Sequence, residues 1–292
     1  MKTNLDCLPC FMRQALYTAR IATDSPELQE KILHRAAHLL TEFDLDISPP
    51  ENAVALYRII AETSGRPDPF ATLKKESNRL ALELQPSTRK RILNAQDSLA
   101  FAIKFAIAGN IIDYGAHHHF DARKTINNCL EKQLAINDYE AFQRELSKAQ
   151  SILYLADNCG EIVFDSLLIE QLGPKKVTMA VKEQPIINDA LLADARKCGI
   201  DKTCKIISNG TDCPGTPLNQ CSEEFQKQFD NADLIISKGQ GNFETLSDTK
   251  APIFFLLTVK CPVTATHVNK LAGLNQEAKV GDMVLMQGGH NT

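Results

Sequence analysis

The hydrophobic pattern divides the chain into two parts with different periodicities. Up to about residue 149, apolar residues recur at i, i+3, i+4 and i+7, which places them on one face of an α-helix. This spacing predicts six helices, over residues 7–22, 25–43, 51–64, 69–84, 87–113 and 137–149. Ser25-Pro26-Glu27 supports the start of the second helix, because it offers an N-cap residue followed by proline. We expect no strand pair in this part of the chain.

In the second part, short β-branched runs alternate with amphipathic stretches. Strands are predicted at residues 152–156, 176–181, 205–208, 234–237, 253–257 and 283–286. Helix-like stretches lie between them, near 161–172, 189–198, 219–229 and 241–247. This alternation predicts an α/β fold with a doubly wound, mostly parallel sheet. We therefore expect a helical region over 1–149 and an α/β domain over 150–292, packed as one unit because no long linker separates them.

The composition excludes several classes of protein. Hydrophobic residues make up 43% of the 292 residues and charged residues 23%, which is typical of a soluble globular protein. The net charge of -4 argues against nucleic acid or an anionic membrane as a partner. The N-terminal segment MKTNLDCLPCFMRQ lacks the apolar core of a signal peptide, so we expect a cytoplasmic protein. Its nine cysteines are expected to be reduced thiols.

Polar residues follow the predicted strands, at the edge where open parallel sheets bind ligands. They occur as Asp157-Asn158-Cys159-Gly160-Glu161 with Asp165, Lys182-Glu183-Gln184-Pro185 with Asn188-Asp189, Asn209-Gly210-Thr211-Asp212, Lys238-Gly239-Gln240-Gly241-Asn242, and Lys260. Each motif alone would also fit a turn or a helix cap. Their joint placement after successive strands favours a metal or phosphate site.

The acidic and amide residues of this set fit a hard metal ion. Asp157, Asn158 and Asp189 offer oxygen ligands, which suit Mg²⁺ or Mn²⁺ better than a thiolate-bound zinc. So few protein ligands leave coordination positions for water and a phosphate oxygen. Glu161 or Asp165 would then orient an attacking water.

The lysines and glycines fit a phosphoryl group. Lys182, Lys238 and Lys260 are predicted to neutralise its charge. Gly239 and Gly241 would let backbone N–H groups approach it. Metal, lysines and a glycine-rich turn together indicate phosphate ester hydrolysis.

Several motifs, taken in order, resemble the damage-control phosphatase family. They are Leu155–Glu161 with Asp165, Lys182–Ala190, Ser237–Glu244, Ala108–Asp113, Lys260-Cys261-Pro262 and the N-terminal Cys7-Leu8-Pro9-Cys10. The Cys-x-x-Cys motif is typical of the prokaryotic branch, and the resemblance spans nearly the whole chain. It implies a helical N-terminal portion and a Rossmann-like sheet.

The resemblance also implies a function. Asp157, Asn158 and Asp189 would hold a divalent metal (Mg²⁺, Mn²⁺, Co²⁺ or Ni²⁺), and metal-bound water would attack the phosphorus of a small phosphomonoester. Sugar phosphates and damaged phosphometabolites are the implied substrates. The match also suggests that Asn110 and Asp113 face the substrate, and that the Gly239–Asn242 segment stabilises developing charge.

Three alternatives remain open from the sequence. Asp157 could itself attack phosphorus and form an aspartyl phosphate. An S-adenosylmethionine-dependent carboxyl methyltransferase would need a glycine-rich loop after the first strand, but Asn158–Glu161 contains one glycine, and Lys182 stands where an acidic residue is required. A non-catalytic phosphometabolite-binding protein could use the same pocket.

The remaining candidates are thiols and histidines. Cys7 and Cys10 supply half of a tetrahedral zinc site or a redox pair, or they are simply packed thiols. At a helix start, the dipole would lower a thiol pKa. His117, His118 and His119 point in different directions on any regular element, so we expect a solvated loop.

Overall fold

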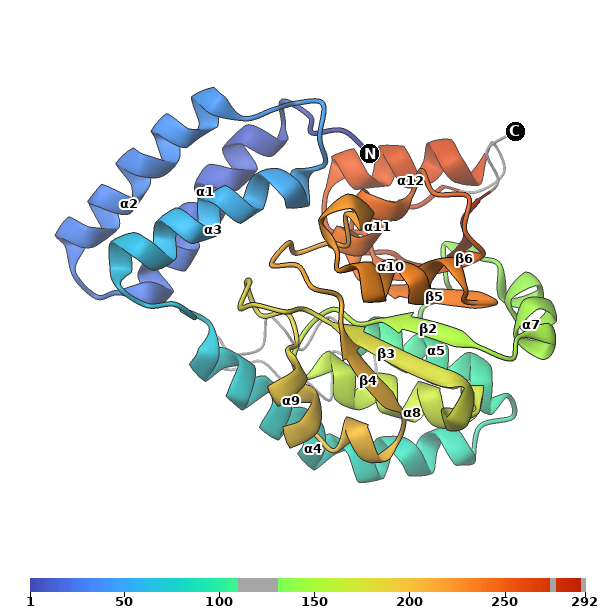
Figure 1. Ribbon diagram of the computed structural model, residues 1–292. Coiled ribbons are helices and arrows are strands. Elements are labelled where there is room, and N and C mark those ends of the chain that lie inside the picture. Colours follow the sequence, from blue (N-terminus) through green and yellow to red (C-terminus); the bar gives the residue numbers. More distant parts are fainter. Residues whose placement is uncertain (110–130, 274–276, 290–292) are drawn as a thin grey trace.

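The computed structural model describes residues 1–109, 131–273 and 277–289, and in this part of the chain the strands form one seven-stranded sheet (Figure 1). The strand order is β1-β7-β6-β5-β2-β3-β4, and β7 runs antiparallel to β6 while the other neighbours are parallel. The strands are β1 (Ile136–Asn137), β2 (Ile152–Leu155), β3 (Val177–Val181), β4 (Lys205–Ser208), β5 (Leu234–Lys238), β6 (Ile253–Thr258) and β7 (Met283–Gln287). The predicted α/β class with a mostly parallel sheet is confirmed.

The strand order reverses between β2 and β5. Counted from β2, the order β4-β3-β2-β5-β6-β7 is the 3-2-1-4-5-6 order of the Rossmann fold. Leu155 of β2 pairs with Ser237 of β5, so Asp157 and Gly239 stand opposite each other two residues further on. Ligands of such sheets bind at this reversal point, beyond the carboxyl ends of the strands.

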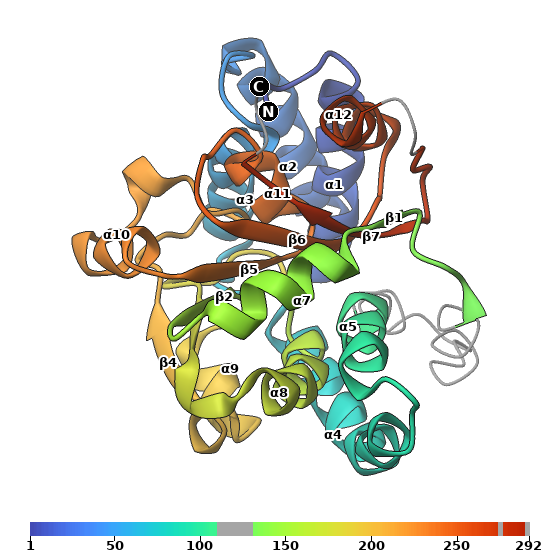
Figure 2. The ribbon, with the colours of Figure 1, turned by 90° about the vertical axis from the view of Figure 1, so that its right-hand side faces the viewer.

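Helices cover both faces of the sheet, which explains the strongly apolar strands (Figure 2). In β2, Ile152 and Tyr154 enter one apolar core while Leu153 and Leu155 enter the other. The first core includes α4 (Ala71–Leu93), α5 (Ser98–Ala108), α7 (Tyr139–Lys148), α8 (Glu161–Leu172) and α9 (Leu192–Lys197). The second includes α10 (Glu223–Asp230), α11 (Gln240–Leu246) and α12 (Pro262–Ala272).

The first three helices form a bundle with a core of its own. They are α1 (Cys7–Ala22), α2 (Pro26–Leu39) and α3 (Pro49–Ser64). Phe11, Ile32, Leu56 and Ile60 are among the residues of this third core. The predicted helical region of residues 1–149 is thus divided in space, with α1–α3 apart from the helices that cover the sheet (Figure 1).

Some predicted boundaries were wrong for identifiable reasons. The break expected after residue 84 is absent, because α4 continues through Pro86 while Ala81, Leu84 and Ile92 of its buried face stay packed in the core. The chain turns instead after Asn94, and Asp97 then caps α5 by accepting a hydrogen bond from Ala100 N–H at 2.9 Å. The sequence also gave no signal for β1, since two residues are too few to show a periodicity.

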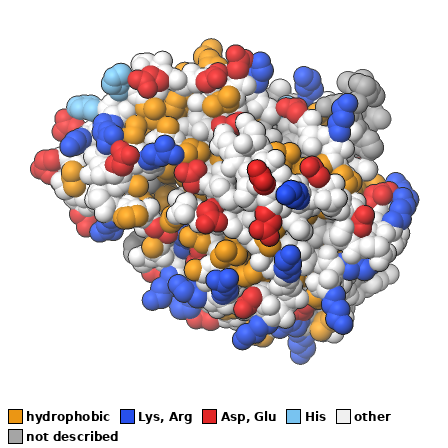
Figure 3. Space-filling view, viewed as in Figure 1, with side chains coloured by type: hydrophobic (Ala, Val, Ile, Leu, Met, Phe, Trp, Pro, Cys, Tyr) orange, Lys and Arg blue, Asp and Glu red, His pale blue; other side chains and the backbone are white. Residues whose placement is uncertain are grey.

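The outer surface carries both signs of charge. Acidic and basic side chains are interspersed over the face in Figure 3. Among the helices of the described ranges, we find none with the length and apolar character needed to cross a bilayer.

Candidate metal and phosphate site

The loops after β2 and β3 are joined by backbone hydrogen bonds. Asn158 and Asp189 form an antiparallel bridge, and Ala190 N–H donates to the Asp157 carbonyl at 2.9 Å. Cys159 N–H donates to the Asn188 carbonyl, also at 2.9 Å. Because of this pairing, α9 begins at Leu192 and not near residue 189, where we predicted its start.

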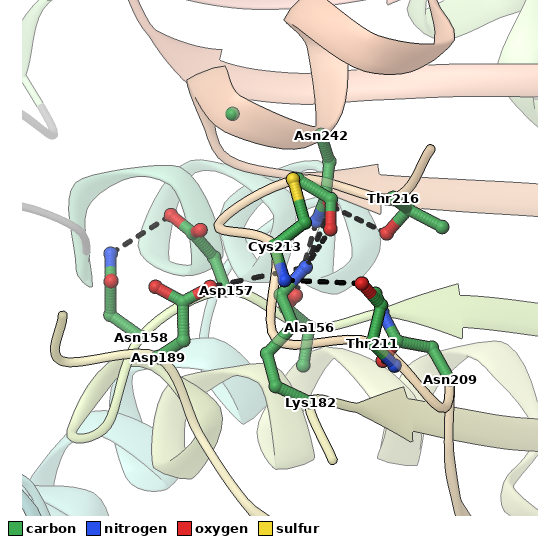
Figure 4. Close-up of polar contacts among 12 residues, drawn as sticks. Ala156, Asp157, Asn158, Lys182, Asp189, Asn209, Thr211, Cys213, Thr216 and Asn242 are labelled. Atoms are coloured by element: carbon green, nitrogen blue, oxygen red, sulfur yellow. Dashed lines mark hydrogen bonds and ion pairs between the residues drawn. The ribbon is translucent and has the colours of Figure 1, made fainter. Parts of the chain in front are cut away.

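The predicted metal ligands come together at this junction. Asp157, Asn158 and Asp189 are each at most 7% exposed, and their side chains lie next to one another in Figure 4. Asn158 Nδ2 donates to Asp157 Oδ2 at 2.8 Å. Two carboxylates and one carboxamide at the strand-end edge are the donor set that a hard divalent cation prefers.

Two backbone positions give the junction its shape. Gly160 has φ of +78°, and its N–H donates to Asn78 Oδ1 of α4 at 2.6 Å. A β-carbon at Gly160 would stand 3.0 Å from Ser77 Cβ, so glycine lets this loop lie against α4. Ile187 has φ of +42°, a left-handed conformation that is strained for a β-branched residue. This turn brings the chain back to Asp189.

The glycines after β5 each allow a close contact with a neighbouring loop. A β-carbon on Gly239 would stand 2.1 Å from Asp157 Oδ2, and Gly239 N–H already donates to the Leu256 carbonyl at 3.1 Å. A β-carbon on Gly241 would stand 1.9 Å from the Pro214 carbonyl oxygen. The two glycines therefore allow close packing of a predicted metal ligand and of a loop. Because the Gly239 N–H is already used, this differs from the backbone contact to phosphate that we expected of Gly239, and the contact expected of Gly241 stays a prediction.

The site carries buried negative charge. The pKa of Asp157 is raised to about 6, mainly by burial and also by the neighbouring Glu161 carboxylate, while Lys260 and Lys182 oppose the shift. A buried carboxylate in this setting gains stability from a bound cation. Within residues 1–109, 131–273 and 277–289, no group of three or more His, Cys, Asp or Glu could hold a metal, so the predicted set depends on the Asn158 amide oxygen.

Lys182 is buried and held in a fixed position beside this set. Its Nζ donates to the Gly215 carbonyl and to Asn242 Oδ1 (3.3 Å), and lies 3.9 Å from Asp189 Oδ2. Figure 4 shows this network reaching from Lys182 to Asn242 and Thr216. Lys182 thus remains a candidate for binding phosphate next to the predicted metal ligands.

Asn242 has its side-chain amide engaged inside the protein. Nδ2 donates to the carbonyls of Ala156 (3.1 Å) and Lys238 (2.8 Å), and Oδ1 accepts from Lys182 Nζ and Thr216 Oγ1. Because both ends of the amide are used, Asn242 is placed to position Lys182. The direct phosphate contact predicted for it is not what this geometry favours.

Lys238 lies behind the site and not in it. It is fully buried, and its Nζ contacts the Ala106 carbonyl (2.9 Å), Glu161 Oε1 (2.5 Å) and Asp165 Oδ1 (2.6 Å). Burial raises the pKa of Asp165 to about 7, with Lys238 opposing and Glu161 adding to the shift. The Tyr154 hydroxyl donates to the same Asp165 oxygen at 2.7 Å. The placement of Lys238 differs from the predicted phosphate contact.

Glu161 connects this buried cluster to the predicted metal ligands. Asn158 Nδ2 lies 3.3 Å from Glu161 Oε2, while Glu161 Oε1 contacts Lys238. Glu161 and Asp165 are at most 1% exposed, so the structure favours a positioning role over the water-orienting role we predicted. Glu161 fixes the Asn158 side chain from behind, and Asp165 shares Lys238 with Glu161.

Lys260 is the exposed cation of the predicted set. Its N–H donates to Gln240 Oε1 at 2.8 Å, and its positive charge lowers the pKa of Asp157. Lys182 and Lys260 therefore both lie within electrostatic range of Asp157, a predicted metal ligand. Asn110, Asp113 and the three histidines at 117–119 lie outside the described residues.

Sequence reasoning missed several supporting residues. Asn78 holds Gly160, Thr216 bonds Asn242, and Thr211 accepts from Cys213 N–H at 3.1 Å. The signal for Asn78 was available, because Lys74 and Asn78 are polar residues on the face of α4 that also carries Ala81 and Leu84. The signal for Thr216 was weak, since it lies in an irregular loop.

The N-terminal thiols are free and half-buried in the first turn of α1. Burial raises the pKa of Cys7, the hydrogen bond with the Asn4 backbone opposes this shift, and the negative charge of Glu244 adds to it. The shift of the Cys7 pKa is therefore upward, whereas we expected the helix dipole to lower it. A metal or redox role for Cys7 and Cys10 stays a prediction.

Comparisons with known proteins support the family. A protein-family model described as "Damage-control phosphatase ARMT1-like domain" matches residues 3–274. A damage-control phosphatase of Pyrococcus horikoshii is 35% identical over 274 residues, covering 92% of this chain and 94% of its own length. One from Archaeoglobus fulgidus is 34% identical over 295 residues, covering 97% and 98%.

A solved structure has the same fold. The crystal structure of a DUF89 family protein from Pyrococcus horikoshii superposes with a TM-score of 0.88 at 33% identity and covers 99% of both chains. Together with the match of the family model over nearly the whole chain, these relationships show that the chain belongs to the damage-control phosphatase ARMT1-like family.

Proposed function

We propose that this protein is a metal-dependent phosphatase that hydrolyses small phosphomonoesters. The observation that carries the proposal is the convergence of Asp157, Asn158 and Asp189, with Lys182 beside them, at the reversal point of the sheet. Relatives named damage-control phosphatases support the same reaction class. The implied substrates are small phosphorylated metabolites, among them sugar phosphates and damaged phosphometabolites.

The metal site fits a divalent ion such as Mg²⁺, Mn²⁺, Co²⁺ or Ni²⁺. Bound by Asp157, Asn158 and Asp189, the ion would polarise a phosphoryl oxygen and lower the pKa of water. Asn158 is held by Glu161, and Asp157 is packed against Gly239, so both ligands are pre-oriented.

The lysines supply the charge for phosphate binding. Lys182 Nζ is fixed by Gly215 and Asn242, which places an ammonium beside Asp189. Lys260 is exposed next to the site and contributes charge from another direction. Both cations would stabilise negative charge that develops on the phosphoryl oxygens. Lys238 acts at a distance, because its ammonium neutralises Glu161 and Asp165.

The attacking group is proposed to be water. Asp157 Oδ2 accepts from Asn158 and lies against Gly239, which suits a fixed ligand. Asp157 as nucleophile would leave an acyl phosphate that hydroxylamine intercepts. If hydroxylamine traps an acyl phosphate at Asp157 during turnover, the attacking group is Asp157 and not water.

The test is phosphate release from a panel of phosphomonoesters after chelator treatment and addition of each metal. Release should require metal and should fall by at least about 100-fold in Asp157→Asn and Asp189→Asn, because each variant removes a charged ligand. Asp201→Asn is the matched control, since Asp201 is exposed on a short helical turn away from the site. Release that survives both site substitutions would sink the proposal. Tight sugar-phosphate binding without release would indicate a binding protein instead.

A further inference from the structure

Two carboxylates share one buried lysine of α4. Lys74 is 3% exposed, and its Nζ contacts Asp68 Oδ2 at 3.2 Å and Asp194 Oδ2 at 3.5 Å. Asp68 lies in the segment between α3 and α4, and Asp194 lies in the first turn of α9. Because a satisfied network of buried polar groups is rigid, Lys74 holds both segments against α4.

Asp194 extends this connection to the loop after β3. Its Oδ2 accepts a hydrogen bond from Leu191 N–H at 3.2 Å, and Leu191 forms a backbone bridge with Lys182. The preceding residue, Ala190, is bonded on both sides. Its N–H donates to the Asp157 carbonyl at 2.9 Å, and its carbonyl accepts from Lys182 N–H at 3.0 Å. The Asp194 carboxylate is therefore hydrogen-bonded to the backbone segment that pairs with two residues of the candidate site.

The same face of α4 holds the other loop that carries a predicted metal ligand. Asn78 lies one turn after Lys74, and its Oδ1 accepts a hydrogen bond from Gly160 N–H at 2.6 Å. Gly160 follows Asn158 by two residues. The loop after β2 is thus supported through Asn78, and the loop after β3 is supported through Lys74.

The loop after β3 needs such support because its backbone is strained. Ile187 has φ of +42°, and a left-handed β-branched residue persists only where the surrounding structure holds it. The hydrogen bond from Leu191 N–H fixes the chain on the other side of Asp189 from this strained turn. Without the Asp194 carboxylate, the loop would relax and carry Asp189 away from Asp157.

We propose that Lys74 and Asp194 are positioning residues that hold Asp189 beside the other predicted metal ligands. They act through the Leu191 N–H and not by binding the metal. This inference rests on the proposed function for the role of Asp189 as a ligand. It adds two residues, from α4 and α9, that keep the loop after β3 in the conformation that binds metal.

The test compares Asp194→Ala with Asp68→Ala, whose wild-type side chains are similarly buried, at 14% and 21% exposed. Each substitution removes one ion pair with Lys74 and one acceptor of a backbone N–H, that of Leu191 (3.2 Å) or of Phe70 (3.0 Å). We expect similar losses of stability in urea unfolding. Affinity for Mn²⁺, measured by calorimetry, should fall at least about tenfold in Asp194→Ala and change by less than about twofold in Asp68→Ala, because only Asp194 is bonded to the ligand loop.

A double variant tests whether Lys74 acts through Asp194. Lys74→Met alone should lower Mn²⁺ affinity, since Asp194 loses the ammonium that fixes it. In the Asp194→Ala background the same substitution should add less than about twofold, because the contact through which it acts is already gone. Equal losses of Mn²⁺ affinity in Asp194→Ala and Asp68→Ala, or no loss in either, would overturn the inference.

Amide hydrogen exchange of the metal-free protein separates this inference from the phosphatase proposal. The N–H groups of Ala190 and Cys159 donate across the junction of the two loops, so their exchange reports how firmly the loops are joined. Exchange at both amides should be about tenfold faster in Asp194→Ala than in Asp68→Ala. If the wild type binds no metal and releases no phosphate, the phosphatase proposal fails, and this difference in exchange would still support the positioning role. Equal exchange in the two variants would overturn it.

Discussion

Gly239 lies so close to Asp157 that a β-carbon on it would stand 2.1 Å from Asp157 Oδ2. The contact joins the ends of β5 and β2 at the reversal point of the sheet. We expect Gly239→Ala to push the Asp157 carboxylate out of position and to lower metal affinity by at least about 100-fold, since ligand geometry controls binding. Calorimetric metal titration and phosphate release measure this effect.

The control for Gly239→Ala is Gly199→Ala. Gly199 has φ of +74°, close to the +79° of Gly239, but a β-carbon there would meet no atom within 4 Å. Alanine at Gly199 bears the cost of about 1 kcal/mol for the left-handed conformation (ψ of 19°), whereas Gly239 has ψ of 163°, a conformation nearly restricted to glycine, so its backbone cost is larger. If the two variants had equal metal affinity, the contact with Asp157 would not matter for the site.

Replacing Lys238 should affect stability more than phosphate binding. Lys238→Met removes the ammonium that contacts Glu161 and Asp165 and leaves two carboxyl groups together in the core. The free energy of unfolding should fall by about 3 to 5 kcal/mol, as for other buried ion pairs that lose one partner. Urea unfolding with metal removed measures this loss.

Lys148→Met is the matched surface substitution. Lys148 pairs with Glu145 at 2.8 Å on an exposed face of α7, so its loss should change stability by less than about 1 kcal/mol. If Lys238→Met had wild-type stability but a strongly raised KM for phosphomonoesters, the result would support the direct phosphate contact predicted from the sequence.

The buried carboxyl groups predict how stability depends on pH. The pKa values of Asp157 (about 6) and Asp165 (about 7) exceed the usual 3.8, so the folded protein binds more protons than the unfolded chain between about pH 4 and 7. Stability without metal should therefore be highest at the acid end of this window and fall as pH rises through it. Urea unfolding at pH 5, 6 and 7 after chelation measures the slope, and Asp165→Asn should flatten it. A stability that rises over this range in the wild type would contradict the raised values.

The edge of the sheet where the site lies could be predicted from sequence alone. Short apolar strands alternating with helices fix the parallel order, and the carboxyl ends of such strands carry the ligands. Asp157, Asn158 and Asp189 were predicted together for that reason, and the structure brings them into contact. Their assignment as metal ligands remains to be tested.

The sequence alone did not show to which side each lysine side chain points. For Lys238 the reason is that strand β5 is one residue longer than predicted. We predicted that this strand ends at Ser237, which would place Lys238 in a loop facing the ligand. In the structure β5 includes Lys238, so its side chain points to the same face as Leu234 and Ile236, toward α5 and α8. Lys182 follows β3 directly and reaches the site. Which lysine meets buried carboxylates depends on α8, and only the folded structure shows that.

Asn242 tests whether a residue acts on phosphate directly or through Lys182. Its Oδ1 accepts from Lys182 Nζ, so Asn242→Ala should raise KM for a phosphomonoester by releasing that ammonium from its position. In a Lys182→Ala background the same substitution should add little, because the interaction through which it acts is already gone. If Asn242 contacted phosphate itself, the two losses would multiply. Steady-state kinetics of both single variants and the double variant separate these cases, with unfolding curves to correct for the roughly 1 to 3 kcal/mol lost by leaving buried carbonyls unpaired. A multiplicative loss would return Asn242 to the phosphate-binding role predicted from the sequence.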